Sequence, residues 1–216
     1  MNSKLLIRLG IFASAMSSIC APASALSLTG TFSSDDQMFT TRFIVPGATS
    51  ELTTLRTFSY AGGIDALGQT VAEGGFDPIV SLYSAAGTLV GLSDDGIGVP
   101  ADALSGVGAD SLLSISLAPG VYQVVLTEND NFPNGDLSTG FSEAGNGDFT
   151  AGWDGCSASK FCDSYGFART GNWSLDISAA TPVTAAVPEP SGIALTLAGL
   201  MLIAVMTRTR RQGINA

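Results

Sequence analysis

The sequence predicts an all-β protein folded as an antiparallel β-sandwich, and three observations support this class. Short stretches in which apolar and polar residues alternate recur along the chain, for example at residues 39–45 and 173–177. Turn formers separate these stretches, since the chain contains 26 glycines and 9 prolines. No segment between the two apolar ends has the periodicity of a helix. Alternation with period two is the pattern of a strand that buries one face, so we expect about seven or eight short strands.

The expected strands follow one another at short intervals. Besides the two stretches above, we expect strands at residues 52–60, 79–83, 88–92, 110–117 and 121–127. Two hairpins are predicted, one with a turn at Gly87 and one with a turn at Ala118-Pro119-Gly120. In the second hairpin, alternation predicts six buried side chains: Leu113, Ile115, Leu117, Tyr122, Val124 and Leu126. Residues 132–171 lack alternation and are expected to form a long loop.

The segment between the two apolar ends is strongly acidic. Residues 26–187 contain 4 basic and 18 acidic residues, a formal charge of −14. Such a surface repels phosphate backbones, so we expect no nucleic-acid partner. It attracts divalent cations, although simple solubility is the more common reason for an acidic surface.

Five aspartates at expected strand ends suggest a calcium site. Asp77 and the pair Asp94–Asp95 flank the first predicted hairpin, whose open ends lie side by side. Asp35 and Asp36 occupy another turn of the same sandwich. Calcium takes six to eight oxygen ligands from carboxylates, carbonyl groups and water, which strand ends can supply. The alternative is that these residues are ordinary turn formers.

The sequence lacks the residue type on which several common catalytic sites depend. The chain has no histidine, so a Ser-His-Asp triad and a His-containing zinc site are both excluded. Cys156 and Cys162 remain after the N-terminal segment, and in an oxidising compartment we expect them to form a small disulfide loop. Paired carboxylates can hydrolyse sugars, but a chain this acidic brings some pair together by chance. We therefore expect a protein that is not an enzyme.

The N-terminus has the features of a secretory signal peptide. Lys4 and Arg8 precede an apolar run at residues 9–19, and Ala23-Ser24-Ala25 fits the small-residue cleavage rule. We expect a signal peptide at residues 1–25, followed by a β-sandwich domain at residues 26–178.

The C-terminus has the features of a membrane anchor. A stalk rich in Pro and Ala at residues 179–190 ends in Pro188-Glu189-Pro190, and an apolar run follows. Arg208, Arg210 and Arg211 come after this run. We expect a transmembrane helix with its basic tail at residues 191–211, and the basic residues place the domain outside the cytoplasm.

The order of these C-terminal features resembles the PEP-CTERM sorting tail of bacterial surface proteins. This resemblance implies recognition by an exosortase, a membrane protease that processes the tail. It also implies a host that makes exopolysaccharide, so exopolysaccharide is a candidate partner. An ordinary C-terminal anchor with a proline-rich stalk is the alternative. In both cases the protein is exported to the cell envelope or beyond, and it is held in the membrane before processing.

The central domain resembles one group of PEP-CTERM exoproteins and, more loosely, the pre-peptidase C-terminal domain. The motifs that carry the resemblance are Ser59-Tyr60-Ala61-Gly62-Gly63, Gly74-Gly75-Phe76-Asp77-Pro78, Ser93-Asp94-Asp95-Gly96, Ala118-Pro119-Gly120-Val121-Tyr122 and Arg169-Thr170-Gly171-Asn172-Trp173. The resemblance implies a jelly-roll-like sandwich in which some relatives bind calcium or polymers. It implies no enzyme activity.

Two functions remain open at this stage. The first is a non-catalytic surface protein associated with exopolysaccharide or extracellular matrix. The second is a secreted lectin or glycoside hydrolase, in which aromatic residues of the long loop such as Trp153, Phe161 and Tyr165 stack on sugar. Packing of these aromatic residues over the end of the sandwich is the alternative to sugar stacking.

Processing of the tail is the first testable expectation. An extended Pro-Glu-Pro segment cannot join the helix and stays accessible to a membrane protease, so we predict cleavage near Pro188–Pro190 in the host. Intact-mass measurement of the surface-released protein checks this. A released form that still carries Arg208, Arg210 and Arg211 would contradict it.

Overall fold

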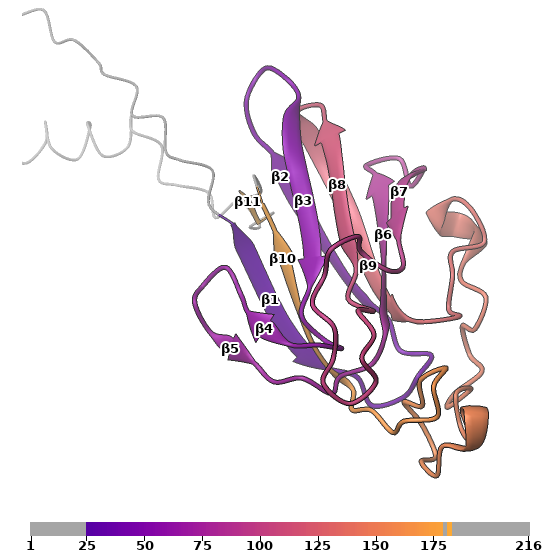
Figure 1. The fold of residues 1–216 in the computed structure, drawn as a ribbon. Coiled ribbons are helices and arrows are strands. Elements are labelled where there is room, and N and C mark those ends of the chain that lie inside the picture. Colours follow the sequence, from indigo (N-terminus) through magenta and orange to yellow (C-terminus); the bar gives the residue numbers. More distant parts are fainter. Residues whose placement is uncertain (1–24, 179–180, 183–216) are drawn as a thin grey trace, which may run out of the picture.

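Two antiparallel sheets packed face to face form the body of the protein (Figure 1). The computed structural model describes residues 25–178 and 181–182 of the chain. One sheet has the strand order β1 (Leu26–Thr31), β10 (Asn172–Ile177), β3 (Glu51–Thr57) and β8 (Leu112–Leu117). The other has the order β11 (Thr181–Pro182), β2 (Phe39–Val45), β9 (Gly120–Glu128), β6 (Pro78–Ser84) and β7 (Leu89–Ser93). The prediction of an all-β, antiparallel protein is confirmed.

Smaller elements lie outside the two sheets. Strands β4 (Gly63–Ile64) and β5 (Thr70–Val71) form a separate short ribbon. Two 3-10 helices, η1 (Leu137–Thr139) and η2 (Trp153–Gly155), interrupt the long loop expected at residues 132–171. This loop, in salmon and orange in Figure 1, runs from the turn between β6 and β7, where Leu137 N–H donates to Gly87 O, along the side of the second sheet to the opposite end.

Inward-facing residues of both sheets meet in one hydrophobic core. Phe43 and Val45 of β2 and Leu126 of β9 enter this core from one sheet, and Leu175 and Ile177 of β10 enter it from the other. All five are buried, as the period-two alternation of their strands predicts. Burial of apolar surface therefore holds the two sheets together.

Strand β6 is buried on both of its faces. Val80 and Leu82 lie in the core between the sheets, while Tyr83 packs on the outer face against Val125 and Phe141. Tyr83 and Phe141 meet edge to face, with ring centroids 6.5 Å apart. The long loop thus covers the outside of the second sheet where β6 and β9 lie.

The second predicted hairpin is wrong. Strands β8 and β9 do not pair with each other, because β8 pairs with β3 in one sheet and β9 pairs with β2 and β6 in the other. The turn at Ala118 and Pro119 carries the chain across the core from one sheet to the other. Alternation reports that one face of each strand is buried, and two facing strands of a sandwich satisfy it as well as a hairpin does.

Only part of the burial predicted for these two strands is confirmed. Leu117, Val124 and Leu126 are buried. Leu113, Ile115 and Tyr122 are partly buried and pack against the rim of the core. For Leu113 and Ile115 the reason is that β8 is the last strand of its sheet, so solvent reaches one of its edges.

Several predicted segments lie outside the described residues. These are residues 1–24 of the expected signal peptide, most of the stalk at residues 179–190 and the expected transmembrane helix at residues 191–211. In the part of the chain that the structure describes, no helix is long and apolar enough to cross a membrane.

Truncating Leu126 tests the core. Leu126 is fully buried, so Leu126→Ala should lower the free energy of unfolding by about 2–5 kcal/mol. Leu52→Ala is the matched control, because Leu52 is 65% exposed and its loss should cost less than about 0.5 kcal/mol. Chemical denaturation of both variants measures the difference. Equal losses would show that Leu126 does not lie in the core.

Candidate metal site

Three neighbouring strands bring acidic residues to one end of the second sheet. Strands β6 and β7 form the first predicted hairpin, which is confirmed, with Val80 opposite Ser93. Continuing this register past the paired residues places Asp94 and Asp95 beside the start of β6, where Asp77 precedes Pro78. On the other side of β6, Pro78 is opposite Glu128 of β9. Strand pairing therefore assembles the cluster.

The chain around Asp77 is fixed by close packing. Gly75 lies against the carbonyl oxygens of Ser59 and Asn172, which a Cβ at this position would strike. Phe76 is fully buried and stacks on Phe32 with ring centroids 5.0 Å apart. Pro78 then holds Asp77 in an extended conformation. The Gly-Gly-Phe-Asp-Pro motif thus delivers one carboxylate to a defined place.

The Asp94–Asp95 turn is equally constrained. A Cβ on Gly96 would strike Leu112, so the turn lies directly on the start of β8. Ser111 places its Oγ within 2.5–2.8 Å of the carbonyl oxygens of Pro78, Ser93 and Asp94. This hydroxyl links the ends of β6 and β7 and holds the two sides of the hairpin mouth together.

One carboxylate oxygen from each of Asp77, Asp94 and Asp95 lies within 4.8 Å of the other two. The three side chains run from the interior to the surface, since Asp77 is buried, Asp94 is half-buried and Asp95 is exposed. Oδ1 of Asp77 and Oδ1 of Asp94 are buried and have no hydrogen-bond partner. Oδ2 of Asp77 accepts one hydrogen bond, from Asn129 Nδ2 at 3.3 Å. Buried carboxylate oxygens without donors are costly unless a proton or a cation satisfies them.

The surroundings of the cluster oppose negative charge. Burial, and then the charges of Asp94 and Asp95, raise the pKa of Asp77 well above its usual range. Burial and the Asp95 charge raise the pKa of Asp94 to about 6. Burial also raises the pKa of Asp95. A cation bound among the three carboxylates would reverse this repulsion.

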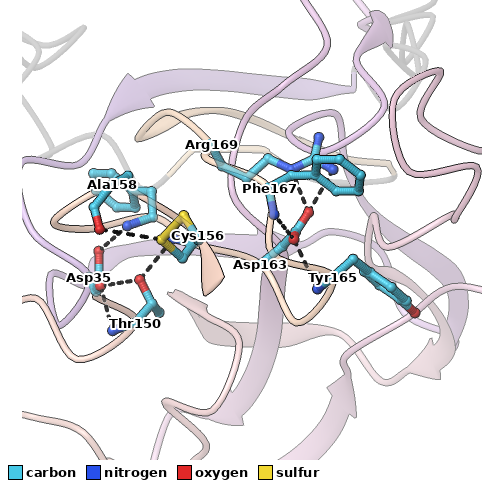
Figure 2. Close-up of a disulfide and its surroundings, with 10 residues drawn as sticks. Asp35, Thr150, Cys156, Ala158, Asp163, Tyr165, Phe167 and Arg169 are labelled. Carbon is cyan, nitrogen blue, oxygen red and sulfur yellow. Dashed lines mark hydrogen bonds and ion pairs between the residues drawn. A yellow bond between two sulfur atoms is a disulfide. The ribbon is translucent and has the colours of Figure 1, made fainter. Parts of the chain in front are cut away.

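Asp35 and Asp36 are not part of this cluster, so their predicted place in the metal site is wrong. Asp35 is buried and accepts hydrogen bonds from the backbone N–H groups of Thr150 and Phe161, each at 2.8 Å, and from the Thr150 hydroxyl (Figure 2). Its oxygens are therefore used to hold the long loop. Asp36 accepts a hydrogen bond from Ser34 Oγ at 2.6 Å, which lowers its pKa. An Asp-rich turn can bind a cation or hold a loop through hydrogen bonds, and the spacing of its aspartates in the sequence does not distinguish these two roles.

Glu128 was missed as a candidate. It is 2% exposed, and its Oε2 has no hydrogen-bond partner. Burial, and then the charges of Asp35 and Asp77, raise its pKa well above the usual range. The signal in the sequence is the alternation of β9, which places Glu128, the last residue of the strand, on the same face as Val124 and Leu126 of the core.

A second group of buried charges ties loops together. Arg169 forms ion pairs with Asp163 at 2.7 Å and Asp102 at 3.1 Å, and its guanidinium stacks on Tyr60 at 3.9 Å. Asp163 also accepts the backbone N–H groups of Tyr165 and Phe167, as Figure 2 shows. Both carboxylates thus have a cationic partner, in contrast to the Asp77 cluster. This group is therefore structural, because its acids are neutralised by Arg169.

Cys156 and Cys162 form a disulfide, with an Sγ–Sγ distance of 2.05 Å. The bridge closes a turn of the long loop between the Asp35–Thr150 contact and the Asp163–Arg169 ion pair (Figure 2). Cys162 also donates its N–H to Thr150 Oγ1 at 2.9 Å. The disulfide thus reinforces the segment that Asp35 anchors.

The predicted sorting residues lie outside the described part of the chain: Pro188, Glu189, Pro190, Arg208, Arg210 and Arg211. No protein-family model matches the chain, and a search of curated proteins finds no significant relative. The fold and the cluster therefore define a class only: an all-β, disulfide-bonded domain with a candidate oxygen-donor cation site.

The raised pKa values predict how stability depends on pH without metal. An acid whose pKa is higher in the folded than in the unfolded state stabilises the fold below its unfolded pKa of about 4, and this contribution is lost as pH rises through the folded pKa. With a chelator present, the free energy of unfolding should fall as pH rises from about 4 through the Asp94 pKa of about 6. Urea denaturation across this range measures it, and Asp94→Asn should flatten the profile. Stability that rises across the range would contradict the assignment.

Proposed function

We propose that this protein is a non-catalytic exported module that calcium stabilises and that associates with exopolysaccharide or extracellular matrix at the cell surface. The observation that carries this proposal is the cluster of Asp77, Asp94 and Asp95, with two buried oxygens that no donor satisfies. Burial of these carboxylates destabilises the folded state, and a bound cation would offset this cost.

Calcium is the cation whose chemistry fits the donor set best. All three side chains offer oxygen, and the chain has no histidine to favour zinc or copper. Calcium accepts six to eight oxygens in flexible geometry, so water would complete its shell around the three carboxylates. Magnesium needs tighter octahedral geometry and releases water less readily, so it should substitute poorly.

Export is supported by the disulfide and by the two ends of the sequence. A disulfide persists in oxidising compartments, where the expected signal peptide would deliver the chain. The Pro-Glu-Pro segment, apolar run and arginine cluster fit processing by an exosortase-type membrane protease. Until that cleavage, the C-terminal helix would hold the domain at the membrane.

A jelly-roll connectivity is part of the proposal. Leaving aside the short strands β4, β5 and β11, one sheet has the order β1-β10-β3-β8 and the other β2-β9-β6-β7, with every pair antiparallel. Sandwiches with two interlocked Greek keys arrange eight strands in this way. This order supports the likeness to small jelly-roll domains of secreted proteins.

The proposal of a non-catalytic module rests on residue types. The chain has no histidine, so neither a Ser-His-Asp triad nor a His-containing zinc site can form. For the lectin alternative, the three aromatic residues named for sugar stacking offer one exposed side chain. Phe161 is buried and stacks near Phe76, and Trp153 contacts Phe149, while Tyr165 is exposed.

Calcium should raise the melting temperature of the protein purified after export. At a hundredfold excess over the dissociation constant, binding stabilises the folded state by about 2.7 kcal/mol, which corresponds to roughly 5–10 °C. Asp94→Asn should remove most of this rise. Asp154→Asn is the matched control, since Asp154 is exposed and lies outside the cluster, and it should keep the full rise.

Scanning calorimetry with calcium, magnesium or EDTA provides the measurement. Melting curves that do not differ between calcium and EDTA at constant ionic strength would overturn the proposal. The three aspartates would then be turn residues that share a proton.

A further inference from the structure

A shallow groove adjoins the Asp cluster. It has a volume of about 470 Å³ and follows the seam where edge strand β7 of one sheet meets edge strand β8 of the other. Its lining includes Leu92, Asp94, Asp95, Ile97, Leu112 and Leu113. Two of the three cluster residues, Asp94 and Asp95, therefore line this groove beside four apolar side chains.

The apolar walls of this groove are open to solvent. Ile97 is 97% exposed and Leu92 is 42% exposed. Ile97 directly follows the Asp94-Asp95-Gly96 turn, whose backbone is fixed against β8. An exposed apolar side chain adds little to the stability of the fold. Beside a cation site, it is available to contact a ligand.

The three carboxylates differ in burial, so a bound cation would have a side that faces the protein and a side that faces the groove. Asp77 is buried and reaches the cation from inside, while Asp95 is exposed at the groove. Three monodentate carboxylates satisfy only part of a calcium shell of six to eight oxygens. The positions that remain on the outer side face the groove, where a ligand can replace water.

Resting on the calcium site proposed above, we propose that the cation binds neighbouring hydroxyl groups of a neutral polysaccharide lying in this groove. Two adjacent hydroxyl oxygens would replace two waters on the cation. The C–H face of the same sugar would pack against Leu92 and Ile97.

Charge selects a neutral ligand. Three carboxylates around one divalent cation leave a net charge of −1, and the segment from residue 26 to residue 187 carries −14. A uronic acid polymer is repelled by this field, and a second copy of the chain brings the same negative charge. Hydroxyl groups bind calcium through neutral oxygens, so they incur no such repulsion.

Retention on immobilised polysaccharide tests the inference. The probes are two neutral polymers with free neighbouring hydroxyls, mannan and galactan, together with permethylated mannan and anionic polygalacturonate. The protein purified after export should be retained on mannan or galactan with calcium and released by EDTA. It should not be retained on either of the other two polymers.

Two variants separate this groove from the calcium site. Ile97→Ser should weaken retention about tenfold, because an apolar contact is lost, while the calcium-dependent rise in melting temperature stays unchanged. Ile64→Ser is the matched control, since Ile64 is 66% exposed on β4 and does not line the groove. It should change neither measurement.

The possible failures differ from one another. A calcium-dependent rise in melting temperature without retention on mannan or galactan overturns the groove inference and leaves the calcium site standing. Retention on polygalacturonate alone, or calcium-dependent dimerisation that occupies the groove, also overturns it. No rise in melting temperature with calcium removes the site itself, and with it this inference.

Discussion

Strand β6 is buried on both faces and hydrogen-bonded on both edges, and the rest of the molecule is built around this constraint. Its inner face belongs to the core between the sheets, and its outer face is covered by the long loop. Strand β7 pairs with one edge and β9 with the other. Because both faces and both edges of β6 are in contact with the rest of the protein, the residues at its ends have fixed positions. Sheet pairing therefore places Asp77 beside Asp94. The burial of the core stabilises the fold enough to offset the repulsion between these two carboxylates.

Buried carboxylates serve two purposes in this domain, and their hydrogen bonds separate the two. Asp35 and Asp163 accept several backbone N–H groups and organise the long loop. Asp110 does the same for the turn at residues 59–61, where it accepts the N–H groups of Ser59, Tyr60 and Ala61. Asp77 and Glu128 are just as deeply buried but keep an oxygen without a donor. Carboxylates whose oxygens accept hydrogen bonds stabilise the fold, whereas those with an oxygen that lacks a donor need a proton or a cation.

Sequence patterns predicted those parts of the fold that depend on residues near one another in the chain. Alternation located the main strands, and the turn at Gly87 identified the β6–β7 hairpin that assembles the cluster. The pairing of β8 and β9 was mispredicted because alternation does not say which strand a buried face meets. Asp35 was misassigned for a similar reason, since its partners Thr150 and Phe161 are more than a hundred residues away. Glu128 is the opposite case, because its burial follows local alternation: it continues the inward positions of Val124 and Leu126 on β9. Long-range packing decided the other two cases.

The central claim is that Asp77, Asp94 and Asp95 together hold one cation. A crystal structure of the protein grown with calcium tests this most directly, with anomalous scattering to identify the ion. The account predicts one calcium ion about 2.3–2.6 Å from a carboxylate oxygen of each residue, with water or a hydroxyl ligand on the groove side. Crystals grown in the same calcium that show water among the three carboxylates, or two of them sharing a proton at hydrogen-bond distance, would contradict it.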